Sequence, residues 1–104
     1  MAKTALLAKL TAKEGMRDEL LAVIADIGMS NVAGEPGTEV YAAHKDQNDA
    51  DVVWFYELYS DQSALEAHGG SEQMKVFGRA TREFMAARPE LIFLDPAVAK
   101  GLDF

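Results

Sequence analysis

The chain predicts an α+β fold in which helices cover one face of an antiparallel sheet. Short segments with apolar residues at every second position are typical of strands, and longer segments with apolar residues three and four positions apart are typical of helices. Along the 104 residues these patterns occur in the order strand, helix, strand, strand, helices, strand. At this length we expect one domain, residues 1–104.

The first half of the chain predicts a strand, a helix and a turn. Residues 4–12 form the expected strand, and Thr11 and Glu14 have the spacing of a capping box for the following helix. The stripe of this helix consists of Met16, Leu20, Val23, Ile24 and Ile27. The sequence GEPG then ends it, with Pro36 and Gly37 suited to the central positions of a type II turn.

The second half predicts a hairpin, two helices and a last strand. Asp61 and Ser71 precede the two helices as candidate N-caps. The expected elements are strands at 38–45 and 52–60, helices at 62–68 and 72–87, and a strand at 91–95. This order is that of a split βαβ, or ferredoxin-like, sandwich.

The strand at residues 52–59 is apolar on both faces, because alternate residues of a strand face opposite sides. Two helices cover only one face of a sheet. On the other face Trp54 and Tyr56 alone expose about 300–500 Å², as much as the largest patch on most monomers. We therefore expect a homodimer packed sheet to sheet, with Trp54, Tyr56 and Leu58 in the interface. The alternative is that the helices wrap more of the sheet.

Composition and charge exclude several classes of partner. The 17 acidic and 10 basic residues give a net charge of -7 without a basic run, so no nucleic acid is expected. No segment is long and apolar enough to span a membrane. Cysteine is absent, which fits a reducing compartment, and we expect the cytoplasm. The two histidines lack metal-ligand spacing, so no metal is expected. The sequence has no glycine-rich loop that would bind phosphate groups, so no flavin, nicotinamide or nucleotide is expected either.

Glu57 is the one charged residue in the apolar strand and is a candidate for chemistry. A carboxylate beneath the helices is costly unless it has a partner. The next helix brings His68 back over that layer, where contact with Glu57 would favour the charged imidazole. Alternatively, His68 simply ends its helix before Gly69, and Glu57 reaches a backbone donor or solvent at the sheet edge.

Several aromatic residues are candidates to line a substrate cavity between sheet and helices. They are Tyr41, Phe55, Tyr59, Phe77 and Phe84. Taken singly, each is better explained as a core residue, and only their coincidence with Glu57 and His68 makes the group a candidate cavity lining. Ser71, after two glycines, leaves free amides at a helix start that could receive an anionic oxygen, although capping by Ser71 itself is the commoner use.

Two stretches resemble a known family. EPGTEVYAAHKD, from Glu35, and FYELYSDQSALEAHGGSEQMKVF, from Phe55, resemble the antibiotic biosynthesis monooxygenase (ABM) domain family, whose members look like EPG-x3-Y-x2-H-x-D, a Tyr-Glu strand and DQ-x-AL-x-AH. The resemblance covers nearly the whole chain and is most specific from Tyr56 to His68. It implies a dimeric ferredoxin-like α+β barrel. Its members oxidise quinols or polyketide phenols without flavin or metal, degrade haem, or isomerise small signalling molecules.

The chain departs from many of these relatives at identifiable positions. Gln73 and Met74 stand where others carry a second histidine and an aromatic, and Tyr59 stands where a tryptophan is frequent. The haem-degrading branch has an asparagine in the first strand and a histidine in the last long helix, near which this chain has Ala8 and Gly78. The resemblance therefore implies no haem.

We expect a cofactor-independent monooxygenase that acts on a small quinol or polycyclic phenol with O₂. Such a substrate can supply electrons to O₂ once it loses a proton, so a positioned base lowers the barrier. His68 is the expected base and Glu57 its orienting partner. Two alternatives are an isomerase of a small carbonyl compound, which uses the same pair without O₂, and a dimer that binds a small molecule without turnover.

Overall fold

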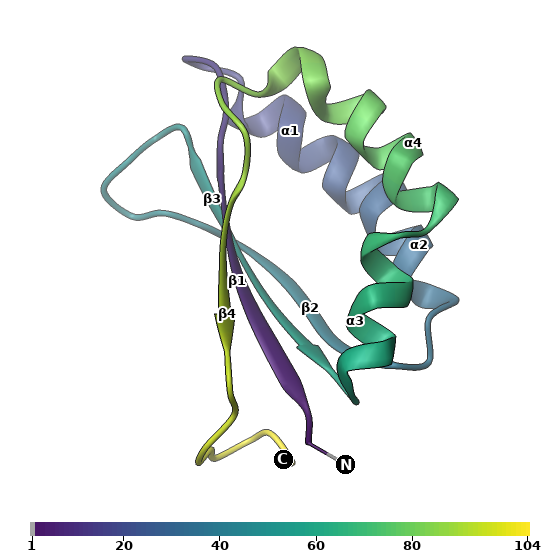
Figure 1. Ribbon diagram of the computed structural model, residues 1–104. Helices are drawn as coiled ribbons and strands as arrows, with labels where there is room; N and C mark the ends of the chain where they lie inside the picture. Colours follow the sequence, from purple (N-terminus) through teal and green to yellow (C-terminus); the bar gives the residue numbers. More distant parts are fainter. Residues whose placement is uncertain (1) are drawn as a thin grey trace.

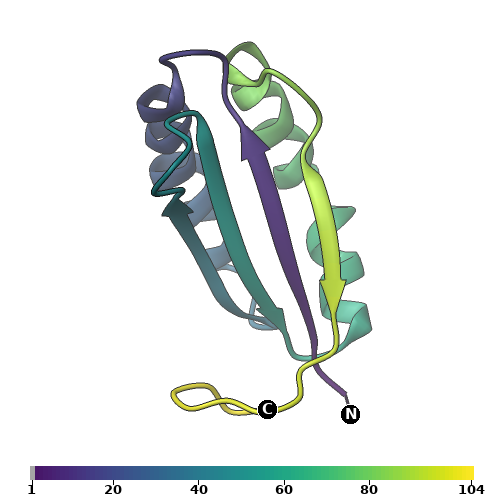
Figure 2. The ribbon, with the colours of Figure 1, turned by 90° about the vertical axis from the view of Figure 1, so that its left-hand side faces the viewer.

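A computed structural model describes residues 2–104 and confirms the predicted fold class (Figure 1). The strands are β1 (Thr4–Thr11), β2 (Thr38–Lys45), β3 (Val52–Tyr59) and β4 (Glu90–Leu94). The helices are α1 (Arg17–Val23), η1 (Ile24–Gly28), α2 (Met29–Ala33), α3 (Gln62–Gly69), α4 (Glu72–Thr81) and η2 (Arg82–Phe84). The sheet has the order β2-β3-β1-β4, and its neighbours are all antiparallel. All the helices lie on one face of it (Figures 1 and 2).

The strand register decides which side chains face the helices. Leu6 of β1 pairs with Glu57 of β3, and Tyr41 of β2 pairs with Glu57 from the other side. Alternation then puts Phe55 and Tyr59 on this same face, which we call the front face. The front-face residues of β3 are all buried: Val53, Phe55, Glu57 and Tyr59. The front face of β3 is therefore buried beneath the helices, and the carboxylate of Glu57 is buried with it.

The first helical region begins later than the sequence predicts, and the expected capping box is wrong. Thr11 is the last residue of β1, and α1 starts at Arg17 after Met16, which makes no side-chain cap. Helical residues then run without a break from 17 to 33, with a π-helical turn at Ile24–Gly28. Arg17 donates to the backbone carbonyls of Asp46, Asp49 and Val52, and it thereby fixes the loop of the β2–β3 hairpin.

The turn at residues 35–38 also differs from the prediction. The Thr38 amide donates to the Glu35 carbonyl at 3.1 Å, so Pro36 and Gly37 are central as expected. Gly37 does not have the positive φ that a type II turn requires. Glycine is needed here for space, because a Cβ at this position would lie 2.5 Å from the Cβ of Ala64 in α3. The turn and α3 consequently approach each other closely.

The face of the sheet away from the helices, the back face, is partly covered within one chain. Val52 and Leu58 are each 1% exposed, whereas Trp54 and Tyr56 are half-buried. The Trp54 indole donates to Asp46 Oδ2 at 2.8 Å. The carboxyl-terminal tail passes the end of the sheet near the amino terminus, where Lys3 Nζ donates to the Asp103 carbonyl (Figure 2). Among residues 2–104, no helix has the length and apolarity to cross a membrane.

Candidate functional site

A cavity of about 360 Å³ lies between the front face and the α3–α4 region. Its walls are almost entirely apolar and come from β1, β2, β3, α3, α4 and β4. They include Leu6, Tyr41, Phe55, Leu65, Phe77 and Phe93. Phe93 and Leu91 of β4 are 61% and 52% exposed, so the cavity is open to the surface beside this edge strand. Such a volume is at the small end of ligand sites, which suits a small organic molecule.

Two ionisable groups lie together in the wall of this apolar cavity. Nε2 of His68 is 3.9 Å from Oε1 of Glu57, and both side chains are 7% exposed. The strand alternation puts Glu57 in the wall, and the last turn of α3 brings His68 above it. The α3 helix is fixed at its start by Asp61, whose carboxylate accepts from the Ala64 amide as the sequence predicted.

Burial and hydrogen bonding together set the protonation of Glu57. Burial is the largest influence and raises the pKa of this carboxyl, whereas the hydroxyl of Tyr59, which donates to Oε1, lowers it. A positive charge on His68 also lowers the pKa of Glu57. Burial, followed by the nearby charge of Glu57, raises the pKa values of Tyr59 and Tyr41. Both phenols therefore stay protonated, and Glu57 holds a proton to higher pH than a free glutamate.

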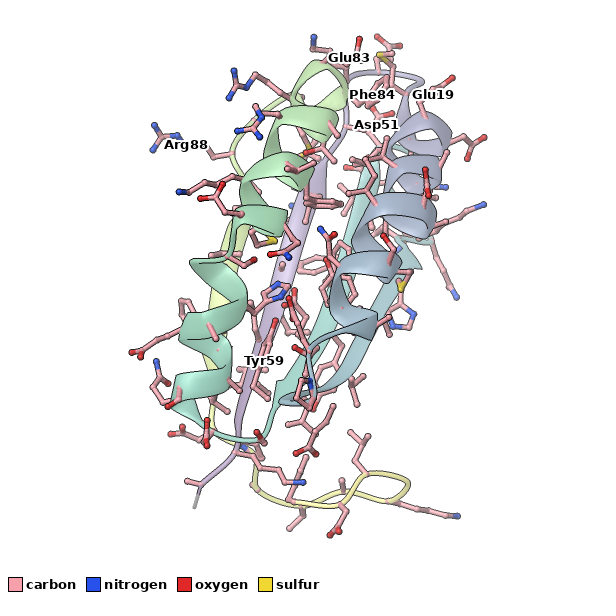
Figure 3. The ribbon with its side chains drawn as sticks, turned by 90° about the vertical axis from the view of Figure 1, so that its right-hand side faces the viewer. Glu19, Asp51, Tyr59, Glu83, Phe84 and Arg88 are labelled. Atoms are coloured by element: carbon pink, nitrogen blue, oxygen red, sulfur yellow. The ribbon has the colours of Figure 1, made fainter. Side chains whose placement is uncertain are left out.

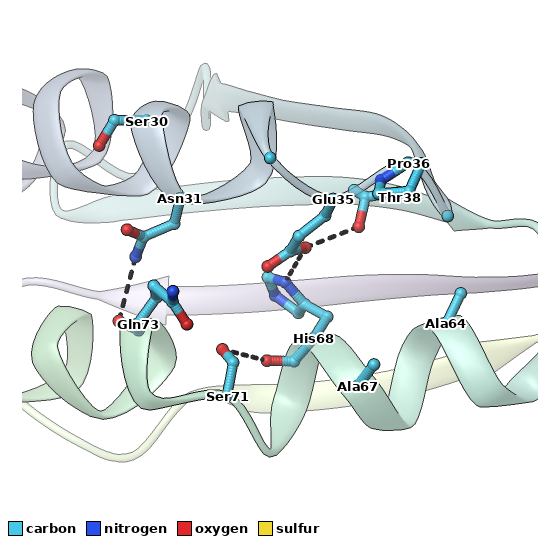
Figure 4. A pocket seen from close by; sticks show the side chains of 12 residues that line it. Ser30, Asn31, Glu35, Pro36, Thr38, Ala64, Ala67, His68, Ser71 and Gln73 are labelled. Carbon is cyan, nitrogen blue, oxygen red and sulfur yellow. Dashed lines mark hydrogen bonds and ion pairs between the residues drawn. The ribbon is translucent and has the colours of Figure 1, made fainter.

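The direct hydrogen-bond partner of the imidazole is Glu35, not Glu57. Nδ1 of His68 is 2.7 Å from Oε1 of Glu35, which also accepts from the Thr38 hydroxyl at 2.8 Å (Figure 4). The ring of His68 further packs between Tyr41 and Tyr59, with ring centroids 5.7 and 5.5 Å away. The imidazole is thus held by a hydrogen bond on Nδ1 and by packing against the two phenol rings, whereas Nε2 lies 3.9 Å from Glu57, beyond a hydrogen bond.

A second cavity, of about 520 Å³, lies on the Glu35 side of the imidazole (Figure 4). It is bounded by the end of α2, the 35–38 turn, one side of α3 and the start of α4. Its polar residues include Ser30, Asn31, Glu35, Thr38, Ser71 and Gln73. Comparison of the two linings shows that they share His68 alone. The ring therefore lies between an apolar cavity and a more polar one, which we call the polar cavity.

The predicted site residues divide among several places. Tyr41, Phe55 and Phe77 line the apolar cavity with Glu57 and His68. Ser71 lines the polar cavity instead, where its hydroxyl caps α4 by accepting from the Met74 amide and donates to the His68 carbonyl.

Two predicted lining residues border neither of these cavities. Tyr59 is fully buried beside Glu57 and acts as its hydrogen-bond donor. Phe84 lies at the opposite end of the layer between helices and sheet, where it packs against the hydrophobic core (Figure 3).

Sequence reasoning missed Glu35 as a site residue. It precedes the Pro36-Gly37 turn and lies 33 positions before His68, so no helical or strand spacing links the two. The sequence feature that points to Glu35 is a pair of small residues. Gly37 and Ala64 allow the turn to contact α3, which brings Glu35 within reach of the His68 imidazole. Among residues 2–104, no group of three or more His, Asp or Glu side chains is arranged to hold a metal ion.

The sequence matches one domain family over residues 4–80, that described as antibiotic biosynthesis monooxygenase (ABM). The chain belongs to the ABM family. The match includes β1 to β3, α3 and most of α4, and therefore both glutamates and His68. No curated protein matches the sequence.

Solved structures share the fold over almost their full length. A Caulobacter crescentus CB15 protein, assigned to the ABM monooxygenases, is 29% identical with a TM-score of 0.86 over 93% of this chain and 92% of that chain. PA3566 of Pseudomonas aeruginosa is 22% identical, with a TM-score of 0.80 over 94% and 97%. Rv0793 of Mycobacterium tuberculosis is 19% identical, with a TM-score of 0.80 over 94% and 98%. The last two support the fold alone.

Proposed function

We propose that this ABM-family chain is a cofactor-independent monooxygenase of a small hydroquinone or polycyclic phenol. The observation that carries the proposal is the buried pair formed by His68 and Glu57 in the wall of a largely apolar cavity. An apolar cavity suits both an aromatic ring and O₂, and an aromatic ring bound there displaces water from around the base. We propose that the whole chain, residues 1–104, is one domain that works in the cytoplasm.

The proposed reaction needs no electron donor other than the substrate. A phenol with a free position on its ring gives a quinone and water: the O–H proton and the ring C–H proton leave as water with one oxygen atom of O₂, and the other oxygen atom joins the ring. Four electrons pass from the substrate to O₂. A free phenol has a pKa of about 10, so removal of its proton is the step that a positioned base assists.

His68 and Glu57 have separate proposed roles in this reaction. Nε2 of His68 faces the cavity side and removes the phenolic proton. Because its pKa is raised, Glu57 can hold a proton and donate it to the oxygen atom that leaves as water. The phenol ring then lies among Tyr41, Phe55 and Phe77, whose rings line the cavity.

We also propose that the chain works as a homodimer through its back face. Trp54 and Tyr56 are only half-buried in one chain, and Ile92 on the same face is 48% exposed. Burial of apolar surface contributes about 25 cal/mol per Å², which offsets the cost of association. Leu58 is already buried within one chain and contributes less to the interface than the sequence suggested. Sedimentation at micromolar concentration tests this, with a dimer as the expected species.

The test of the activity uses menadiol and 1-naphthol with metal-free protein, under air and under nitrogen. We expect 1-naphthol to give naphthoquinone, and menadiol to give a hydroxylated quinone one oxygen atom heavier than menadione, faster with protein than without it under air, and neither product to form under nitrogen. Equal rates with and without protein for both probes would contradict the proposal. Turnover of a small carbonyl compound that is independent of O₂ would point to the isomerase instead.

A further inference from the structure

The imidazole of His68 is placed asymmetrically between two carboxylates. Its Nδ1 is in hydrogen-bond contact with Glu35 at 2.7 Å, whereas its Nε2 is 3.9 Å from Glu57, which is beyond a hydrogen bond. Glu35 borders the polar cavity, and Glu57 borders the apolar one. Each nitrogen of the ring is therefore assigned to one cavity.

The contacts of Glu35 indicate where the imidazole proton lies. Oε1 of Glu35 already accepts the Thr38 hydroxyl, and the Glu35 side chain remains 22% exposed at the polar cavity. Donors on one side and solvent on the other both stabilise the carboxylate as an anion. An anionic carboxylate only accepts hydrogen bonds, so the nitrogen in contact with it must donate. The proton then lies on Nδ1, and the lone pair of a neutral ring lies on Nε2, on the side of the apolar cavity.

We propose that Glu35 is a positioning residue for His68: it holds the proton on Nδ1, keeps a bare Nε2 available to the apolar cavity, and stabilises the imidazolium once Nε2 has accepted a proton. The proposal rests on the function given above and deepens it. In the first step the substrate O–H bond breaks, an Nε2–H bond forms, and the electron pair stays on the substrate oxygen. In a later step Glu57 gives its proton to the oxygen atom that leaves as water, and the proton on Nε2 passes to the Glu57 carboxylate, so that both groups return to their starting state. Glu35 stays anionic and Nδ1 stays protonated throughout.

This division explains why the same ring meets two cavities. The polar cavity leaves Glu35 in contact with solvent, and the apolar walls around Nε2 offer water few hydrogen-bond partners. The hydrogen bond between His68 and Glu35 connects the two cavities. The positive charge that forms on the imidazole when Nε2 takes the substrate proton is therefore stabilised by the carboxylate of Glu35, on the solvent side. An interaction of this kind acts on the base without touching the substrate.

The experiment compares Glu35→Gln and Glu35→Ala with Glu72→Gln, a control that makes the same change at an exposed residue at the start of α4. The tautomer of the neutral His68 ring is read from its ¹⁵N NMR shifts in the free protein. We expect the wild type to carry its proton on Nδ1. Glu35→Gln can still accept from Nδ1 and keeps this tautomer, whereas Glu35→Ala loses the preference.

The kinetic arm uses the quinol or phenol turned over by the wild type. We expect kcat to fall by about tenfold in Glu35→Gln and by about a hundredfold or more in Glu35→Ala, with KM changed by less than about threefold, because Glu35 does not line the substrate cavity. Thr38→Val removes only the second hydrogen-bond donor to Glu35 and should lower kcat by less than tenfold. This variant keeps the carboxylate in place and provides a second test if Glu35→Ala does not fold.

Two results would overturn the proposal: a wild-type ring protonated on Nε2, or a folded Glu35→Ala variant with the kcat and tautomer of the wild type. The tautomer does not depend on turnover. If no probe is oxidised but the ring carries its proton on Nδ1 and loses that preference in Glu35→Ala, the proposed oxygenation fails and the positioning stands. If probes are oxidised but the ring is protonated on Nε2, the positioning alone fails.

Discussion

The two glutamates beside His68 have the same side chain but different surroundings. Glu57 projects from the middle of β3 into an apolar cavity, is 7% exposed, and accepts the hydroxyl of Tyr59. Glu35 stands in a turn, is 22% exposed at a polar cavity, and accepts from Thr38 and His68. Burial raises the pKa of Glu57 above the usual carboxyl range. The difference teaches that position in the fold, not residue type, decides whether a carboxyl is buried or in contact with solvent, and therefore whether its pKa is raised by burial.

The largest effect is expected from the ring that joins the two glutamates. His68→Ala removes the proposed base, so kcat/KM on the oxidised probe should fall by about 10²–10⁴. His44→Ala is the matched control, because His44 is exposed and pairs with Trp54, which lies on the back face. Steady-state kinetics under air measure both variants. Full activity in His68→Ala would contradict the assignment of the base.

The Glu57 side of the comparison depends on Tyr59. Tyr59→Phe removes the hydroxyl that donates to the buried carboxyl, and this should lower the free energy of unfolding by about 1–3 kcal/mol. Tyr41→Phe is the control, since the Tyr41 hydroxyl has no hydrogen-bond partner among the residues described, 2–104. Urea denaturation at neutral pH measures both. Equal stability of the two variants would show that the Tyr59 hydroxyl contributes nothing to holding Glu57.

The Glu35 side depends on close contact between its turn and α3. In Gly37→Ala the new Cβ would lie 2.5 Å from that of Ala64, so the turn or the helix must shift. We expect a loss of about 1–3 kcal/mol in the free energy of unfolding. Gly34→Ala, at the end of α2, has open space for a Cβ and is the control. Thermal denaturation that gave the same midpoint for both variants would argue against a tight turn–helix contact.

A smaller, pH-dependent effect is expected from Glu57 itself. Its pKa is higher in the folded than in the unfolded chain, so between the two pKa values the folded protein binds more protons. Stability therefore falls as pH rises through this window, from about 4.3 upward, by at most about 1.4 kcal/mol per pH unit. Above the folded pKa it becomes constant. Urea midpoints across pH measure this loss, which Glu57→Gln should remove.

In that comparison, an identical pH dependence in wild type and Glu57→Gln would mean that the carboxyl titrates alike in both states. A wild type that gains stability over the same window, relative to the variant, would reverse the sign of the shift and assign Glu57 as an anion like Glu35.

Patterns within one element predicted much of the fold and the positions of several candidate-site residues within it. The alternation along β3 correctly put Glu57 under the helices and Trp54 on the opposite face, because a strand has a fixed period of two. The N-caps at Asp61 and Ser71 were also correct, because a cap is a local contact.

Contacts between distant segments were not predictable in the same way. The predicted capping box at Thr11 failed because β1 runs on through that residue, and Ala12 bridges to Met85 far along the chain. Glu35 was missed because only the packing of the turn against α3 brings it to His68. Tyr59 was predicted to line the cavity, but its hydroxyl donates to Glu57 instead. Side-chain packing determines this contact, and the periodicity of the strand does not reveal it.

The most direct test of the central claim, that the apolar cavity is an oxygenation site whose base is His68, is isotope labelling with 1-naphthol. The protein is incubated under ¹⁸O₂ in unlabelled water, and the naphthoquinone is analysed by mass spectrometry. We predict one ¹⁸O atom per product molecule, formed faster than in buffer or with His68→Ala. Product without ¹⁸O, or labelled product that forms equally fast in all three samples, would contradict it.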